Sequence, residues 1–146
     1  MNVFDWRMIV CQIIAMQCFY YVSMCFILGL LRGVLGLTIP VSLSVFFAAE
    51  GKLFSISNAE GWACIAVHIL AALLGAGLQV LVIEKAKRCL DFSSTLQMLH
   101  MIICWKYAGR FPHGWHWWGV QIVSFFLMVL IGEYLCAKKE MRDIPI

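Results

Sequence analysis

Cysteines are the most reactive side chains of this 146-residue sequence, and they stand at positions 11, 18, 25, 64, 89, 104 and 136. No two of them are spaced as CxxC, which argues against a membrane-bound disulfide-forming or quinone-coupled oxidoreductase. Cys11, Cys18 and Cys25 recur every seven residues, which predicts one packing stripe along a helix. Cys89 and Cys136 instead lie beside basic residues, where juxtamembrane cysteines are candidates for S-palmitoylation.

Histidines and amides within apolar segments are the other groups that could do chemistry. His68 and His100 could hold a haem or a metal ion between two helices. No carboxylate accompanies them within these segments, so a hydrogen bond to a neighbouring helix is the favoured role. The amides in the same setting are Gln12, Gln17, Gln79, Gln97 and Gln121. There is no GxSxG, HExxH or P-loop pattern, so we predict no catalytic residue, metal site or cofactor, and no enzyme.

The elements that must position these groups are long apolar segments. Apolar residues make up 63% of the chain and charged residues 13%, against the 45–50% and 25% or so that are usual in soluble domains. Charges divide the chain into spans at about 8–31, 61–83, 92–109 and 111–132, long enough to cross a hydrocarbon core of roughly 30 Å. The third is a short span, and it is plausible only if Lys106 snorkels to the interface. We therefore predict an all-α membrane protein, a single domain over 1–146 with a polytopic bundle of four transmembrane helices.

A fifth apolar stretch, 33–49, is interrupted by Gly33, Gly36 and Pro40. A helix broken at Pro40 leaves pieces too short to span, so we interpret the stretch as a membrane-hugging loop or interfacial helix. Residues 32–60 then form one loop outside the bundle, and residues 133–146 form a tail.

Basic residues set the expected orientation. With four spans, seven of the eleven Lys and Arg residues share a side with both termini, which predicts that both termini are cytosolic. The net charge of +3 is too small to indicate nucleic-acid binding. Small residues spaced four apart, at 29/33, 71/75 and 72/76, would let helices approach closely. A small transporter or channel is the alternative, but the ionisable mid-membrane residues and broken helices typical of transporters are not visible.

An ordered series of short motifs resembles the SYS family of Golgi integral membrane proteins. The matching stretches are Gln12-Ile13, Met16-Gln17, Tyr20-Tyr21, CLDF (89–92), His100, Cys104-Trp105, Tyr107, Arg110-Phe111-Pro112, Trp117-Trp118, Val120-Gln121, GEYLC (132–136) and Ile144-Pro145. The series covers about two thirds of the chain and is much more specific than any one of its motifs. Two segments depart from the family pattern. The entry to the first helix reads Asp5-Trp6-Arg7 instead of Trp-Asp-Pro, and the 32–61 loop has no clear match.

The resemblance implies a receptor in the trans-Golgi membrane. Members of this family look like four-span proteins that recruit an ARF-like small GTPase, the ARF-related protein, whose N-terminus is acetylated. That GTPase supports recruitment of golgin tethers and vesicle-mediated transport. The implied partners are therefore the GTPase and the lipid bilayer, and the 32–60 loop would be luminal.

On this basis, two matched cytosolic segments are the expected docking site. Asp91 lies beside Phe92, and Glu133 lies beside Tyr134 and Leu135, so each segment joins a carboxylate to an aromatic residue at the hydrocarbon boundary. We expect one groove that receives the apolar face of the partner's N-terminal helix. A basic patch beside the anionic leaflet would consist of Lys85, Lys87, Arg88, Lys138, Lys139 and Arg142. The fallback site is the first-helix stripe of Gln12, Met16 and Tyr20.

Overall fold

The computed structural model describes residues 6–40, 42–47, 54–83 and 85–142. Residues 143–146, which end the predicted tail, lie outside the described part, as do residues 48–53 of the predicted loop. The described residues form helices and no strand. The helices are α1 (Trp6–Leu35), α2 (Leu43–Phe47), α3 (Ala59–Val82), α4 (Ala86–Ala108) and α5 (Trp115–Arg142). The predicted all-α class is confirmed.

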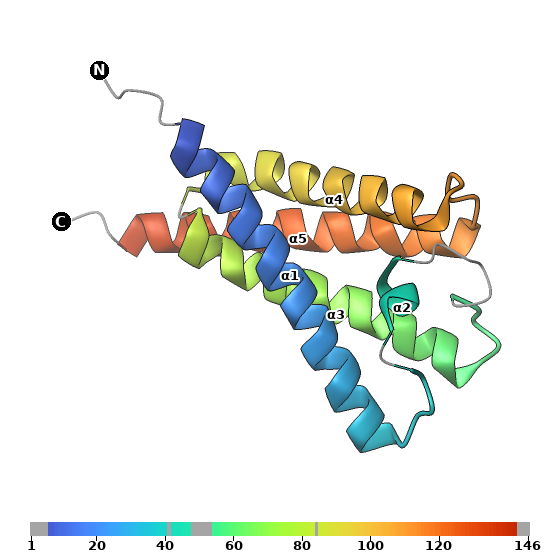
Figure 1. Ribbon diagram of the computed structural model, residues 1–146. Helices are drawn as coiled ribbons and strands as arrows, with labels where there is room; N and C mark the ends of the chain where they lie inside the picture. The colour runs from blue at the N-terminus through green and yellow to red at the C-terminus, as the bar shows by residue number, and fades with distance from the viewer. Residues whose placement is uncertain (1–5, 41, 48–53, 84, 143–146) are drawn as a thin grey trace.

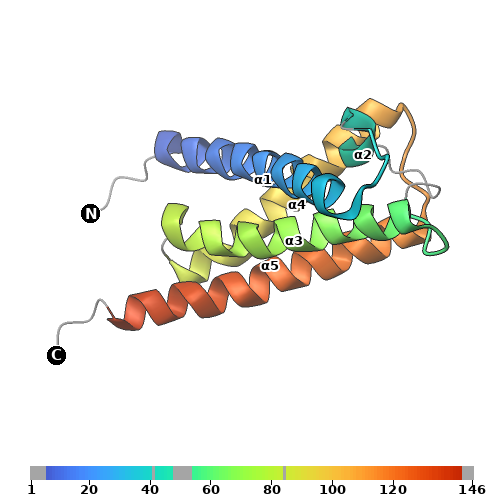
Figure 2. The same cartoon turned by 90° about the horizontal axis from the view of Figure 1, so that it is seen from below.

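The four long helices form a bundle in which α3 is central. Helix α3 packs against both α1 and α5, and α4 packs mainly along α5. Figure 1 shows α4 and α5 running side by side while α1 crosses the bundle obliquely. Figure 2 shows α3 lying between α1 and α5. The start of α1, the α3–α4 junction and the end of α5 meet at one end of the bundle (Figure 1).

Small residues let α3 occupy this central place. Ala71, Ala72 and Ala76 are fully buried, and Gly75 faces Met128 of α5. Small side chains bring backbones close, so this part of the small-residue pattern packs as the sequence predicts. The pair at 29 and 33 differs, because both glycines of α1 are exposed and face open space.

Helix α1 turns its bulky residues, not its cysteines, toward the bundle. Met16, Tyr20, Met24 and Leu28 are buried at helical spacing, whereas the stripe of Cys11, Cys18 and Cys25 is exposed. The prediction of a cysteine packing face is therefore wrong. Periodicity identified one face of the helix, but the large apolar side chains on another face bury more area and take the inward position.

The described part of the 33–49 stretch folds as a loop with one short helix. Gly36 adopts a left-handed conformation (φ 62°) and its N–H bonds to the Arg32 carbonyl, which ends α1. Helix α2 has five residues, too few to span a membrane, and buries Val45 and Phe46. It packs against α4, so this segment lies against the bundle rather than crossing it.

In the part of the chain that the structure describes, three helices and not four are clear candidates to span a membrane. Helices α1, α3 and α5 are long and apolar enough to cross a membrane, whereas α4 is not apolar enough. Helix α4 has 23 residues, nearly as many as the 24 of α3, so its composition and not its length makes the difference. Charged and polar residues lower the hydropathy of α4. They are Lys87, Arg88 and Asp91 in its first turns, followed by Ser93, Ser94, Thr95 and Gln97.

The last helix is longer than its predicted span. It begins at Trp115 and continues to Arg142 without a break at Glu133. The residues predicted to start a tail are thus helical, because a charged residue ends an apolar segment without ending a helix.

A glycine ends α4. Gly109 is its left-handed C-cap (φ 67°). In the connection from α4 to α5, the Trp118 indole donates to the Pro112 carbonyl at 3.0 Å.

Candidate docking site at the basic end of the bundle

The basic residues predicted to form one patch are carried by helix ends that meet. Lys85, Lys87 and Arg88 precede or begin α4, and Lys138, Lys139 and Arg142 lie in the last turns of α5. Figure 1 shows these two helix ends at the same end of the bundle, beside the start of α1. Lys85, Lys87, Lys138 and Arg142 are exposed, so their charges are free to meet a membrane surface or a partner.

Lys139 has a structural role within this patch. Its Nζ donates to the Val80 carbonyl at 3.3 Å, near the C-terminus of α3. Carbonyls in the last turn of a helix have no partner within the helix, and a cation there also complements the helix dipole. Lys139 therefore ties α5 to the end of α3.

The two acid–aromatic segments line two different hollows. Asp91 and Phe92 line a hollow of about 210 Å³ between α1 and α4, together with Ile9, Ile13, Arg88 and Thr95. Glu133 and Tyr134 line a second hollow of about 500 Å³ between α4 and α5. The other residues of this second hollow are Ala86, Lys87, Leu130 and Ala137. The structure thus places the two segments on different sides of α4.

The two segments also differ in the exposed fraction of their aromatic side chains. Tyr134 is 65% exposed, whereas Phe92 is 7% exposed and packs into the bundle. Leu135 and Glu133 are half-buried, and Asp91 is exposed. Of the five residues predicted to contact a partner, Tyr134 therefore offers the largest apolar surface.

Sequence reasoning missed Leu130 and Ala137 as lining residues of the α4–α5 hollow. Leu130, Glu133, Tyr134 and Ala137 follow the i, i+3, i+4, i+7 spacing that places residues on one helix face. That spacing would have identified the surface if the helix had been expected to continue past residue 132.

Cys89 of α4 and Cys136 of α5 contact each other near the basic end. Both thiols are fully buried, and their sulfurs lie 3.3 Å apart at the α4–α5 contact without a disulfide. A palmitoyl thioester needs an exposed thiol, so lipidation of either cysteine would require this contact to open. In the structure the pair serves to pack α4 on α5.

Polar contacts under the basic end hold three helices together. Gln79 of α3 donates to the Ser93 hydroxyl of α4 at 2.5 Å, and both residues are fully buried. Gln12 of α1 donates to the Val82 carbonyl of α3 at 2.7 Å. Because Gln12 is bonded, and Met16 and Tyr20 are buried, the fallback stripe on α1 is not available as a docking surface.

Two buried histidines, His68 of α3 and His100 of α4, meet inside the bundle. Their ring centres are 6.1 Å apart, and the His68 Nδ1–H donates to the Cys64 carbonyl at 2.8 Å. The Tyr21 hydroxyl lies 3.2 Å from His100 Nδ1, which joins α1 to α4. Among the residues described, no group of three or more His, Cys, Asp or Glu side chains could hold a metal ion. His100 thus has the favoured role, a hydrogen bond to a neighbouring helix, whereas the bond of His68 lies within its own helix, α3.

Comparison with known proteins identifies the family. A family model described as "Integral membrane protein S linking to the trans Golgi network" matches residues 1–146. The chain belongs to the SYS1 family. The resemblance and the trans-Golgi membrane localisation predicted from the sequence are confirmed, and the three apolar helices fit a multi-pass protein. The family description names an integral membrane protein and no reaction.

Proteins of the SYS1 family from three organisms are similar to this chain. The chain is 36% identical to "Protein SYS1 homolog" of Nematostella vectensis over 151 residues, 99% of this chain and 89% of the relative. It is 34% identical to the homolog of Dictyostelium discoideum over 145 residues, 99% of this chain and 60% of the relative. It is 22% identical to "Protein SYS1" of Saccharomyces cerevisiae over 132 residues, 90% of this chain and 63% of the relative. The chain thus spans less than two thirds of the last two proteins. No solved structure matches it.

Proposed function

We propose that this protein is a trans-Golgi docking receptor for an ARF-like small GTPase with an acetylated N-terminus, and not an enzyme. Through that GTPase it would support golgin recruitment and vesicle-mediated transport. The observation that carries the proposal is the hollow of Lys87, Leu130, Glu133 and Tyr134, which combines exposed apolar surface with charges of both signs at the basic end. An amphipathic helix has the same combination of an apolar face and a charged border.

The energetics of membrane attachment favour such a receptor. A single acyl chain gives a protein only marginal, reversible membrane binding, and an acetylated helix lacks even that chain. The receptor and the lipid would hold the helix at the same time. While one of them holds the helix, the effective concentration of the helix near the other is raised. The exposed Lys85, Lys87, Lys138 and Arg142 would add attraction to anionic lipid, at about 1 kcal/mol per charge.

The test of this function is a pull-down with the full chain in lipid nanodiscs. ARF-like GTPases locked in the GTP state or the GDP state are the soluble partners. We expect retention of the GTP-locked form alone, because GTP binding releases the N-terminal helix. Equal retention of both forms, or of neither, would reject the proposal. Uptake of a solute by liposomes that contain the protein would instead favour a transporter.

The proposal includes α4 as a fourth membrane-crossing helix, with both termini in the cytosol. Helix α4 runs alongside α5, and its 23 residues cover about 34 Å at 1.5 Å per residue. The polar residues Gln97 and His100 are bonded to or stacked on other helices, so they do not face lipid alone. Four crossings then return the chain to its starting side.

Protease access tests this topology. Tags on the N-terminus and the C-terminus should both be cleaved in intact Golgi vesicles, because seven basic residues lie on that side. A tag inserted in the 48–53 segment should be protected until detergent is added, and it serves as the control for vesicle integrity. Protection of the C-terminal tag alone would mean an odd number of crossings and would contradict the four-span proposal.

A further inference from the structure

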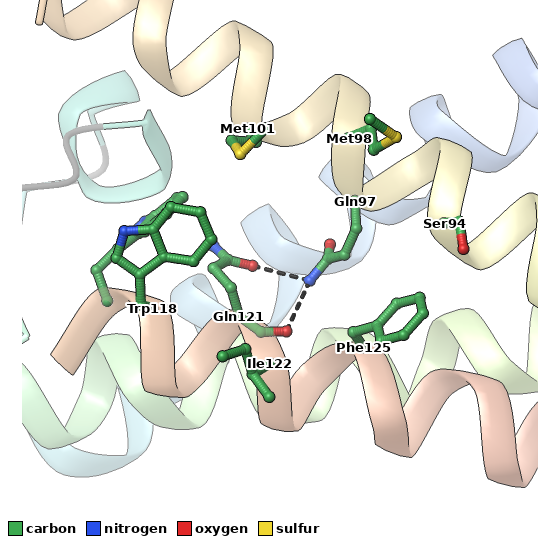
Figure 3. Close-up of a pocket in the computed structure, with 9 residues that line it drawn as sticks. Ser94, Gln97, Met98, Met101, Trp118, Gln121, Ile122 and Phe125 are labelled. Atoms are coloured by element: carbon green, nitrogen blue, oxygen red, sulfur yellow. Dashed lines mark hydrogen bonds between the residues drawn. The ribbon is translucent and has the colours of Figure 1, made fainter. Parts of the chain in front are cut away.

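A crevice between α4 and α5 lies away from the basic end and has no part in the proposed docking. Its volume is about 300 Å³. Its apolar walls include Met98, Met101, Trp117, Trp118, Ile122 and Phe125. Figure 3 shows the two methionines of α4 facing Trp118, Ile122 and Phe125 of α5 across this space. None of the nine described residues that line it is charged.

A pair of amides lies between these walls. Gln97 Nε2 of α4 donates to the side-chain oxygen of Gln121 at 2.9 Å and to its backbone carbonyl at 3.1 Å (Figure 3). Gln121 is 6% exposed and its Nε2 has no hydrogen-bond partner, and neither has Gln97 Oε1. Unpaired polar atoms are costly in hydrocarbon, where water cannot replace the missing partner. Two residues that line the crevice therefore carry a buried, unused donor and a buried, unused acceptor.

A hydroxyl group is a small neutral group that both accepts and donates a hydrogen bond, so it can bond to either amide atom. The depth of the amides restricts the rest of the ligand. Gln121 lies four residues, or about 6 Å, beyond Trp117 along α5, one of the helices that are apolar enough to cross a membrane. A phospholipid head would bring charge to this depth, which is unfavourable. A diacylglycerol would bring two ester groups in addition to its hydroxyl, and besides the amides the aliphatic lining offers only the Ser94 hydroxyl as a donor.

We propose that the α4–α5 crevice binds a sterol, with its single hydroxyl on the Gln97–Gln121 amide pair and its apolar rings between the methionines and Phe125. A sterol has one small polar group and a rigid apolar body, so it satisfies the amides without introducing further polar atoms. Its rings would extend from the amide pair along the apolar walls.

The experiment is photolabelling of the full chain in phosphatidylcholine vesicles with a diazirine-bearing sterol. Labelled peptides are mapped by mass spectrometry, and a diazirine-bearing diacylglycerol is run in parallel. We expect sterol labelling at residues of the crevice, suppressed by excess unlabelled sterol, and little labelling there by diacylglycerol. Equal labelling by both probes would mean that any lipid fills the crevice and would overturn the proposal.

Two neighbouring variants separate site occupancy from general lipid contact. Ile122→Trp places a large ring in the crevice, whereas Val123→Trp adds the same ring outside it, and the two residues are 51% and 49% exposed. We expect Ile122→Trp to abolish sterol labelling of the crevice and Val123→Trp to leave it unchanged.

A third variant tests the amide pair. Gln121→Leu should lower sterol affinity about fivefold, the equivalent of one neutral hydrogen bond of about 1 kcal/mol. Loss of labelling in the Val123→Trp variant, or undiminished labelling in both Ile122→Trp and Gln121→Leu, would reject the site.

Discussion

Replacement of Tyr134 by alanine should reduce GTPase recruitment about thirtyfold, the loss expected when an aromatic anchor of about 2 kcal/mol is removed from an interface. Tyr134 is 65% exposed and lines the hollow between α4 and α5, so its removal should leave the bundle folded. The measurement is binding of the GTP-locked GTPase to nanodiscs that contain equal amounts of each variant.

The matched control for this prediction is Phe126→Ala, which removes an aromatic ring of similar exposure from the same helix but outside the hollow. Phe92→Ala is a poor test of docking, because Phe92 is buried and its truncation would disturb packing. Asp91→Ala tests the α1–α4 hollow instead. Loss of binding in Asp91→Ala with normal binding in Tyr134→Ala would place the partner in that hollow and contradict this prediction.

Addition of one methyl group at Gly132 should destabilise the bundle by about 2 kcal/mol, from overpacking and a strained polar contact. A Cβ at Gly132 would clash with the side-chain oxygen of Gln79, which is fully buried and bonded to Ser93. The Gln79 amide cannot move without loss of that bond. The measurement is unfolding of Gly132→Ala in detergent, followed by fluorescence or by size-exclusion chromatography after heating.

Gly119→Ala is the matched control, because Gly119 lies in the same helix and a Cβ there meets nothing within 4 Å. That variant should be neutral or slightly stabilising, since alanine favours helix over glycine by about 1 kcal/mol. The double variant Gly132→Ala/Gln79→Ala should recover much of the loss, because it removes the clashing amide. Equal stability of Gly132→Ala and the wild type would show that α3 and α5 are less closely packed than described here.

Features that depend on local sequence could be predicted. Uncharged runs identified the regions of α1, α3 and α5, because a span needs a minimum length of apolar residues. The breaks at Gly36 and Pro40 predicted that the 33–49 stretch would not cross, and the described part of it agrees. Small residues at 71, 72, 75 and 76 predicted a close contact, which α3 makes.

Features that depend on how helices rotate and pair could not be predicted. The sequence placed Phe92 and Tyr134 at the same level, but rotation about the helix axes put them on opposite sides of α4. Two hydrogen bonds between helices illustrate this, the bond from Gln79 to Ser93 and the bond from Gln97 to Gln121. Their partners come together only when the helices pack. The polar composition of α4 likewise does not reveal that the helix packs within the bundle, where its polar residues bond to α5 and α1.

The central position of α3 has a consequence for how the protein is made. During synthesis, α1 and α3 can associate as soon as both have left the ribosome, since their contact needs no later segment. Helix α4 emerges next, but most of its contacts are with α5, which is synthesised last. Gln97 of a nascent chain that stops before residue 115 would therefore lack its hydrogen-bond partner, Gln121. Completion of α5 is therefore the step that gives α4 most of its packing contacts and completes the bundle.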